Sequence, residues 1–136
     1  MQLLFFIVLW IPPLIFSDQK EEIVINWNKM LNTHRSECIK ESGVNREDAI
    51  DIQRTITFPN DKNFKCYLKC QVQRLNMLDS EGNFDIPVIL KTVAGTTEQI
   101  NNKCLQEVSN ENDLCNKAYD AAKCTTNEVI ASLNKS

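Results

Sequence analysis

The six cysteines are the residues of this chain that are most able to do chemistry. They are Cys38, Cys66, Cys70, Cys104, Cys115 and Cys124. Cysteines at fixed spacing form either disulfide bonds or thiolate sites for a metal such as zinc. A zinc site needs clustered Cys and His ligands, but the chain has one His and only one close pair of cysteines. The even number therefore favours three disulfides, and we expect neither a metal nor a cofactor.

The segment before the cysteines reads as a targeting signal. Residues 1–17, MQLLFFIVLWIPPLIFS, carry no charge and are followed at once by the charged run DQKEE. They are fewer than the roughly 20 apolar residues of a membrane-spanning helix, which Pro12 and Pro13 would also break. We predict a signal peptide over residues 1–17 and one secreted, extracellular domain over residues 18–136. A membrane anchor is the alternative, and no other stretch is apolar enough for stable membrane insertion.

The charge of the chain argues against nucleic acid as a partner. Lysine and arginine number 15 against 18 acidic residues, which gives a net charge of −3. The basic residues are scattered and form no run that could neutralise successive phosphates. A mildly acidic balance mainly serves solubility.

The apolar residues recur with helical periodicity, and no stretch alternates as a strand does. This pattern predicts an all-α fold of about six short helices, near residues 20–42, 46–53, 61–76, 85–95, 96–108 and 111–123, followed by a final short turn from Thr126. Gly43 and Gly95 are positioned to end helices. The N-caps that we expect are Asn45, Asp61, Asp85 and a capping box of Thr96 with Gln99.

Helical spacing narrows the disulfide pairings without fixing them. Six cysteines allow 15 connectivities. Cys66 and Cys70 share one helix face, so we expect each to bridge to a different element. Cys115 and Cys124 are nine residues apart, which at about 100° per residue places them on opposite sides of one helix. That helix is therefore expected to be clamped between two neighbours.

The cysteine spacing resembles the six-cysteine signature of insect odorant-binding proteins. Successive cysteines are separated by 27, 3, 33, 10 and 8 residues, and the gaps of 3 and 8 are the most distinctive. The 33-residue gap is at the short end for that family. Length, signal peptide, acidity and helix content are similar too, so the resemblance covers the whole mature chain.

The resemblance implies a pairing, a fold and a function. The pairing is Cys38–Cys70, Cys66–Cys115 and Cys104–Cys124, three interlocked bridges around an apolar cavity. The function is that of a carrier, not an enzyme, which takes small apolar or weakly polar molecules such as odorants and pheromones through aqueous secretion to receptors. The partners implied are a small hydrophobic ligand and an olfactory receptor, with the chain as a monomer or weak homodimer.

The inward faces of the expected helices indicate which residues surround a ligand. Small alanines on the sixth helix leave room, and no charged residue lies on these faces, so a neutral ligand suits them. Ile130 and Leu133 in the tail are expected to cover the pocket mouth, and Tyr119 is a polar contact. For any one residue, ordinary core is the alternative. The candidates are Phe64, Leu68, Val72, Leu75, Val88, Ile89, Val93, Leu114, Ala118, Tyr119, Ala121, Ala122, Ile130 and Leu133.

Other functions fit the sequence less well. An acid–base or nucleophilic enzyme usually needs a His beside a Ser, Cys or carboxylate, and His34 lies on an amphipathic face with every Cys assigned to a bridge. Saposin-like domains also have six cysteines, but with short gaps near the two chain ends. A helical cytokine would have a filled core and a protein partner. A hydrophobic-ligand carrier or scavenger outside olfaction remains an alternative.

Overall fold

The computed structural model describes residues 15–135, without the side chains of residues 15–18, 53 and 54. This part of the chain confirms the all-α fold, with one isolated β-bridge, between Leu78 and Phe84. Its seven helices are α1 (Ile15–Asn32), α2 (Arg35–Ser42), α3 (Arg46–Thr55), α4 (Lys62–Arg74), α5 (Ile86–Thr92), α6 (Glu98–Glu107) and α7 (Leu114–Asn134).

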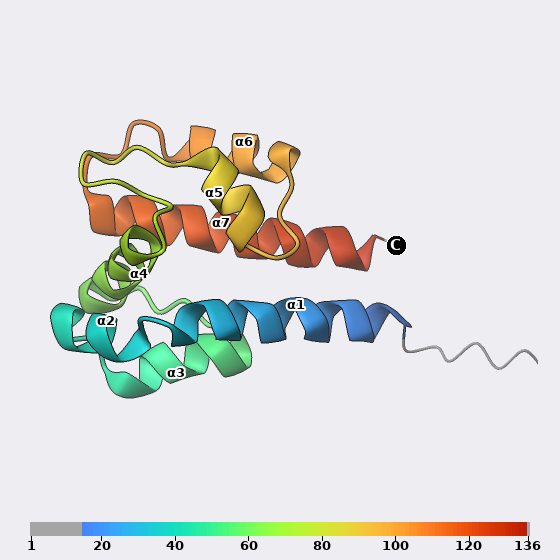
Figure 1. Ribbon diagram of the computed structural model, residues 1–136, viewed down its shortest axis with the longest axis horizontal. Helices are drawn as coiled ribbons and strands as arrows, with labels where there is room; N and C mark the ends of the chain where they lie inside the picture. Colours follow the sequence, from blue (N-terminus) through green and yellow to red (C-terminus); the bar gives the residue numbers. More distant parts are fainter. Residues whose placement is uncertain (1–14, 136) are drawn as a thin grey trace, which may run out of the picture.

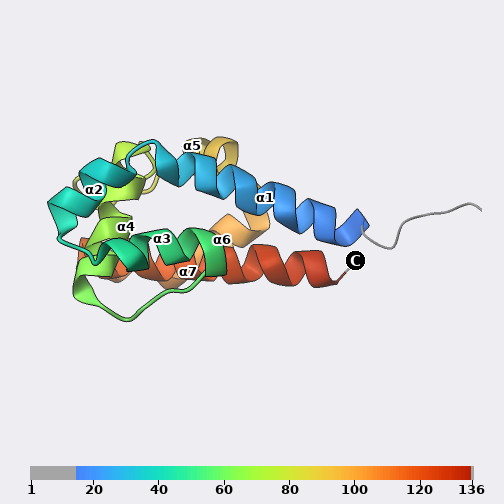
Figure 2. The same ribbon diagram turned by 90° about the horizontal axis from the view of Figure 1, so that it is seen from below.

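The two longest helices lie alongside each other. Figures 1 and 2 show α1 and α7 running in opposite directions, so that the start of α1 and the end of α7 meet at one end of the molecule. Helix α4 packs across α7 at the other end, where α2 lies against α4. Helix α6 packs along the face of α7 that carries Cys124, next to α5. Helix α7 is thus the element against which α1, α4 and α6 all pack.

The predicted signal peptide falls largely outside the described residues. Residues 1–14 belong to that undescribed part, and Ile15–Ser17 form the first turn of α1. The signal peptide and its cleavage site therefore stay predictions. Between residues 15 and 135, none of the helices combines the length and the apolar character that crossing a bilayer requires.

Three disulfides link four of the helices in series. Cys38 of α2 is bonded to Cys70 of α4, Cys66 of α4 to Cys115 of α7, and Cys124 of α7 to Cys104 of α6. These are the pairs that the resemblance implied. Cys115 and Cys124 leave α7 toward different helices, as their offset of half a turn predicted. Helices α1, α3 and α5 contain no cysteine.

The first predicted helix, residues 20–42, is in fact two helices. A turn at Thr33–His34 separates α1 from α2. The Thr33 hydroxyl donates to the carbonyl of Lys29, a side-chain bond that competes with the helical pattern. His34 leaves helical geometry at φ −123° and ψ 16°. The break redirects α2, which places Cys38 against α4.

The predicted division of the C-terminal segment is wrong. The sequence suggested a helix over residues 111–123 and a separate turn from Thr126, whereas α7 is continuous from Leu114 to Asn134. Asp113 caps it by accepting a hydrogen bond from the amide of Asn116. Thr125 and Thr126 weaken a helix by only a few tenths of a kcal/mol each, and packing against α1 and α6 outweighs that.

Four helix starts had a predicted N-cap, those of α3, α4, α5 and α6. Asn45, Asp61 and Asp85 accept hydrogen bonds from backbone amides in the first turns of α3, α4 and α5, which confirms all three predicted N-caps. Only α6 differs, because Thr97, and not Thr96, accepts from the amide of Ile100. Both threonines carry a hydroxyl that can cap a helix, so the sequence alone does not show which of the two is the N-cap.

A hairpin joins α4 to α5 at the predicted turn, residues 79–83. The Asp79 carboxylate accepts from the amides of Asn83 at 2.8 Å and Glu81 at 2.9 Å. The hydrogen bond from the Asn83 backbone is the main cause that lowers the pKa of Asp79. Lys117 of α7 donates to the carbonyl of Gly82 at 2.7 Å and so fastens the hairpin to α7.

Two apolar clusters form the core. One centres on Phe64, Tyr67 and Tyr119 and joins α2, α3, α4 and α7. The other centres on Trp27 of α1 with Ile100 of α6 and Val129 of α7. The clusters lie at different levels along α7, and the space between them becomes the candidate site.

The loop between α5 and α6 fits closely between α1 and α7. The indole nitrogen of Trp27 donates to the carbonyl of Ala94 at 2.8 Å. Gly95 has φ +85°, and a Cβ there would lie 2.7 Å from Cγ1 of Val129 and 3.0 Å from Cδ1 of Ile23. Glycine is therefore required both by its backbone conformation and by this close approach.

We expect Gly95→Ala to destabilise the protein by at least about 2 kcal/mol, because the left-handed backbone costs roughly 1–2 kcal/mol and the contacts with Val129 and Ile23 add to it. Gly43→Ala is the matched control, since Gly43 has φ +70° but its Cβ would meet nothing closer than 3.8 Å. Chemical denaturation followed by circular dichroism measures both. Equal losses would contradict the close approach.

Peptide mapping without reduction should link Cys38 to Cys70, Cys66 to Cys115 and Cys104 to Cys124. The reason is geometric, because each pair joins facing helices. A peptide containing a Cys115–Cys124 link would contradict the arrangement, since these residues lie on opposite sides of α7. Mass spectrometry of the protease-digested, non-reduced protein identifies which cysteines are linked.

Candidate ligand-binding site

A cavity of about 120 Å³ lies between the two apolar clusters. Helices α1, α3, α4, α5, α6 and α7 contribute to its wall, together with the segments that join α3 to α4 and α4 to α5. The lining is mainly aliphatic and aromatic. In size the cavity is comparable to an apolar protein cavity of about 150 Å³ that holds one benzene molecule.

Helices α4, α5 and α7 supply the walls that the sequence pattern indicated. Three alanines of α7 line the cavity, namely Ala118, Ala121 and Ala122, and the first two are buried. Their small side chains leave volume unfilled. The predicted residues that line the cavity are Leu68, Val72, Leu75, Ile89, Val93, Ala118, Ala121 and Ala122.

Two predicted ligand contacts belong to the packed core instead. Phe64 is fully buried among aromatic rings, with its centroid 6.2 Å from that of Tyr119. The Tyr119 hydroxyl donates to the carbonyl of Phe58 at 3.0 Å, so its polar group is used within the fold. Both residues hold α4 against α7 beside the cavity and do not line it.

Four further predicted residues also lie outside the lining. Val88 is half-buried on α5, and Leu114 lies beside Gly82 of the hairpin. Ile130 packs against the Trp27 cluster, and Leu133 is half-buried in the last turn of α7. The expected lid of Ile130 and Leu133 is thus part of a continuous helix.

Helix α1 forms a wall that the sequence pattern did not assign to the site. Val24, Trp27, Met30 and Leu31 line the cavity along this helix. The apolar face of α1 was visible in the sequence, but its direction depends on the break at Thr33–His34. Other lining residues come from loops and short segments that carry no periodicity, namely Ile56, Phe58, Met77 and Phe84.

The polar lining residues also differ from those expected. Besides Asn28, Thr125 and Thr126, the cavity is lined by Gln71 and Asn101, which are 1% and 0% exposed. The Gln71 amide nitrogen donates to the Tyr67 hydroxyl at 2.9 Å. Burial raises the pKa of Tyr67, so this hydroxyl stays protonated at physiological pH. Among the described lining residues none is charged, which favours a neutral guest.

Comparison with known proteins gives the family. The profile of the PBP/GOBP family matches residues 21–128, most of the chain and all six cysteines. The chain belongs to the PBP/GOBP family. It is similar to general odorant-binding protein 99b of Drosophila melanogaster, with 27% identity over 118 residues, which cover 80% of this chain and 78% of that protein.

Two further fruit-fly relatives show the same level of similarity. General odorant-binding protein 99a is 27% identical over 121 residues, which cover 84% of this chain and 84% of that protein. General odorant-binding protein 69a is 25% identical over 114 residues, which cover 82% of this chain and 76% of that protein. No solved structure matches the chain significantly. The match to the PBP/GOBP family covers all the residues that line the cavity, from Val24 to Thr126.

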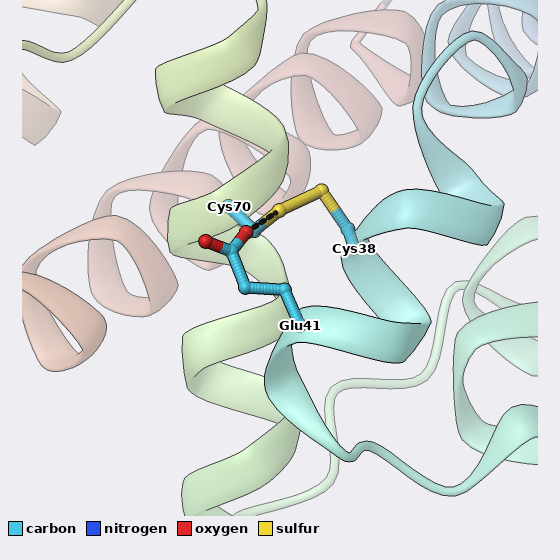
Figure 3. A group of neighbouring side chains, drawn as sticks. All are labelled: Cys38, Glu41 and Cys70. Atoms are coloured by element: carbon cyan, nitrogen blue, oxygen red, sulfur yellow. Dashed lines mark hydrogen bonds between the residues drawn. A yellow bond between two sulfur atoms is a disulfide. The ribbon is translucent and has the colours of Figure 1, made fainter.

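One cluster in this PBP/GOBP chain has residue types that metals prefer, but it is not a metal centre. Within residues 15–135, Cys38, Glu41 and Cys70 bring two sulfurs and a carboxylate together, with the Glu41 oxygen 2.7 Å from the Cys70 sulfur (Figure 3). Both sulfurs belong to one disulfide, so neither is a thiolate ligand. Glu41 lies 3.8 Å from Arg74, which balances its charge.

The single histidine lies away from the cavity. His34 precedes α2, and its Nδ1 is 3.8 Å from the carboxylate of Glu37, which also pairs with Arg74 at 2.8 Å. No cysteine near it is free, since all six form disulfides. Glu37 and Arg74 form an ion pair at the surface of α2, and His34 lies beside it.

Filling the cavity should abolish binding of an apolar guest without destabilising this PBP/GOBP protein. Ala118 is 1% exposed and lines the cavity, so Ala118→Leu adds three carbon atoms to about 120 Å³ of space. We expect at least a tenfold loss of affinity and an unchanged or higher melting temperature. In a filled core the same change would instead cost about 1–3 kcal/mol of stability.

Ala131→Leu is the matched control for this change, because Ala131 is exposed on the same helix. It should alter neither affinity nor melting temperature. Calorimetric titration and thermal unfolding of the three proteins give both quantities. A sharp fall in melting temperature for Ala118→Leu, with affinity per folded molecule retained, would show that the cavity lies elsewhere.

Proposed function

We propose that this protein is a secreted carrier that binds small, neutral, mostly apolar molecules, odorants or pheromones among them, and takes them through aqueous secretion to receptors. The observation that supports the proposal best is an uncharged apolar cavity at the centre of a disulfide-linked shell. Membership of the PBP/GOBP family supports a small-ligand carrier. The fruit-fly relatives are named as odorant-binding proteins, which supports the olfactory role.

The size of the cavity sets the size of the guest. At about 120 Å³ it suits a ligand of roughly benzene size in this conformation. Longer ligands require side chains in the wall to move, and Met30 and Met77 are flexible enough to do so. Small ligands are held chiefly by burial of their apolar surface, so for a guest of about six to eight heavy atoms we expect dissociation constants of roughly 0.1–1 mM, about −4 to −5.5 kcal/mol.

Secretion is the part of the proposal that depends on the N-terminus. Three disulfides form and persist in oxidising compartments, which supports an extracellular location. The apolar and uncharged residues 1–17 supply the signal that secretion needs. A role in transport outside olfaction uses the same cavity, and it differs only in the tissue that releases the protein.

Full-length protein expressed in insect cells should be recovered from the medium with Asp18 as its first residue, as N-terminal sequencing checks. Trp27 is then its single tryptophan and lines the cavity. Toluene should change its fluorescence with saturation, whereas benzoate and benzylammonium of similar size should not, because a charge has no partner in the lining. Secreted protein whose Trp27 responds to none of the three would favour a signalling protein with a filled core.

A further inference from the structure

Two buried amide side chains in the cavity wall have polar atoms without a hydrogen-bond partner. Asn101 of α6 is fully buried, and neither its carbonyl oxygen nor its amide nitrogen is paired. Gln71 of α4 is 1% exposed, and its carbonyl oxygen Oε1 is unpaired as well. Buried polar atoms in proteins are nearly always hydrogen-bonded, so unpaired ones that line a cavity point to a ligand.

The orientation of Gln71 is fixed by its neighbours. Its amide nitrogen donates to the carbonyl of Leu31 at 2.9 Å and to the Tyr67 hydroxyl at 2.9 Å. A backbone carbonyl can only accept, so the nitrogen of Gln71 must face Leu31. Both of its hydrogens are then used, and Oε1 is the acceptor that remains. Gln71 therefore offers an acceptor alone.

Asn101 offers both kinds of partner. Its amide group has a carbonyl oxygen that accepts and a nitrogen that donates, and both are unpaired whichever way the group is turned. Its backbone amide is already bonded to the carbonyl of Thr97 at 2.9 Å, within α6. The residues that line the cavity therefore carry two unpaired acceptor oxygens and one unpaired donor nitrogen, and none of the described lining residues is charged.

We propose that Asn101, together with Gln71, forms a polar subsite that selects small alcohols. The inference rests on the proposed carrier function and names the ligand class of that cavity. A hydroxyl group donates one hydrogen bond and accepts others, so it can donate to an amide oxygen and accept from the Asn101 nitrogen. An ether or ester oxygen only accepts and leaves both amide oxygens unpaired. A carboxylate only accepts and also brings a charge that nothing in the lining compensates.

Benzyl alcohol and anisole test the subsite, because they are isomers that differ in whether the oxygen carries a hydrogen. Calorimetric titration of the full secreted protein should give benzyl alcohol about fivefold tighter binding than anisole, the effect of one net hydrogen bond. In Asn101→Leu the ratio should fall toward one, because one of the two acceptor oxygens and the donor nitrogen are lost. In Asn102→Leu, an exposed neighbour on the same helix, the ratio should remain about fivefold.

The stability of the same variant gives an independent readout. Replacing an unpaired buried amide by an apolar group of similar shape removes a desolvation cost, so Asn101→Leu should keep or raise the melting temperature. A lower melting temperature, or failure to fold, would show that Asn101 is bonded within the protein and would overturn the subsite. Equal affinity for the two isomers in the unmodified protein would overturn it too. If neither isomer binds, the carrier function itself fails.

Discussion

Helix α7 is held covalently on two opposite sides, and the rest of the structure depends on that constraint. Cys115 and Cys124 lie half a turn out of phase, so one bridge leads to α4 and the other to α6. Cys70 extends the chain of links from α4 to α2. Helices α4 and α6 are bonded directly to α7, and α2 is bonded to α4, so the bridges limit how closely these helices can approach one another. The space that they leave along α7 is where the cavity lies.

The free energy that an empty cavity of this size costs is similar to the stabilisation that one disulfide contributes. An empty apolar cavity costs about 24 cal/mol per Å³, which for about 120 Å³ is close to 3 kcal/mol. One disulfide that closes a loop of 20 to 49 residues contributes about 3–4 kcal/mol in the chain-entropy view. The loops overlap, so their contributions do not add in full. Even so, one bridge offsets the cost of the void, and the fold does not need to fill its centre to be stable.

The sequence predicted the parts of the site that depend on regular spacing. The helical class followed from periodicity, and the inward alanines of α7 followed from their place between the two cysteines of that helix. It missed the contribution of α1, because the break at Thr33–His34 sets the direction of that helix and has no periodic signal. Segments without periodicity, such as the one carrying Phe58, could not be placed at all.

The polar part of the site was beyond the sequence for a different reason. Asn101 and Asn102 are adjacent and of the same type, yet one is fully buried and the other exposed. Their burial differs because successive residues of a helix are rotated by about 100° around its axis. The Cys104–Cys124 bridge determines which side of α6 faces α7. A one-residue uncertainty in the register of α6, like that between Thr96 and Thr97, is enough to exchange their roles.

The cavity lining and the cysteine framework share no residue. A substitution in the wall therefore alters what fits inside while the covalent frame and the helix that it holds are left unchanged. In evolutionary terms, the preference for one guest over another can drift independently of foldability. The chain and its fruit-fly relatives have diverged to 27% identity. Such divergence is compatible with the fold when the residues that contact the ligand are separate from the cysteines that hold the helices. Duplicated copies of such a chain can therefore acquire different ligand preferences while they keep the same disulfide-linked fold.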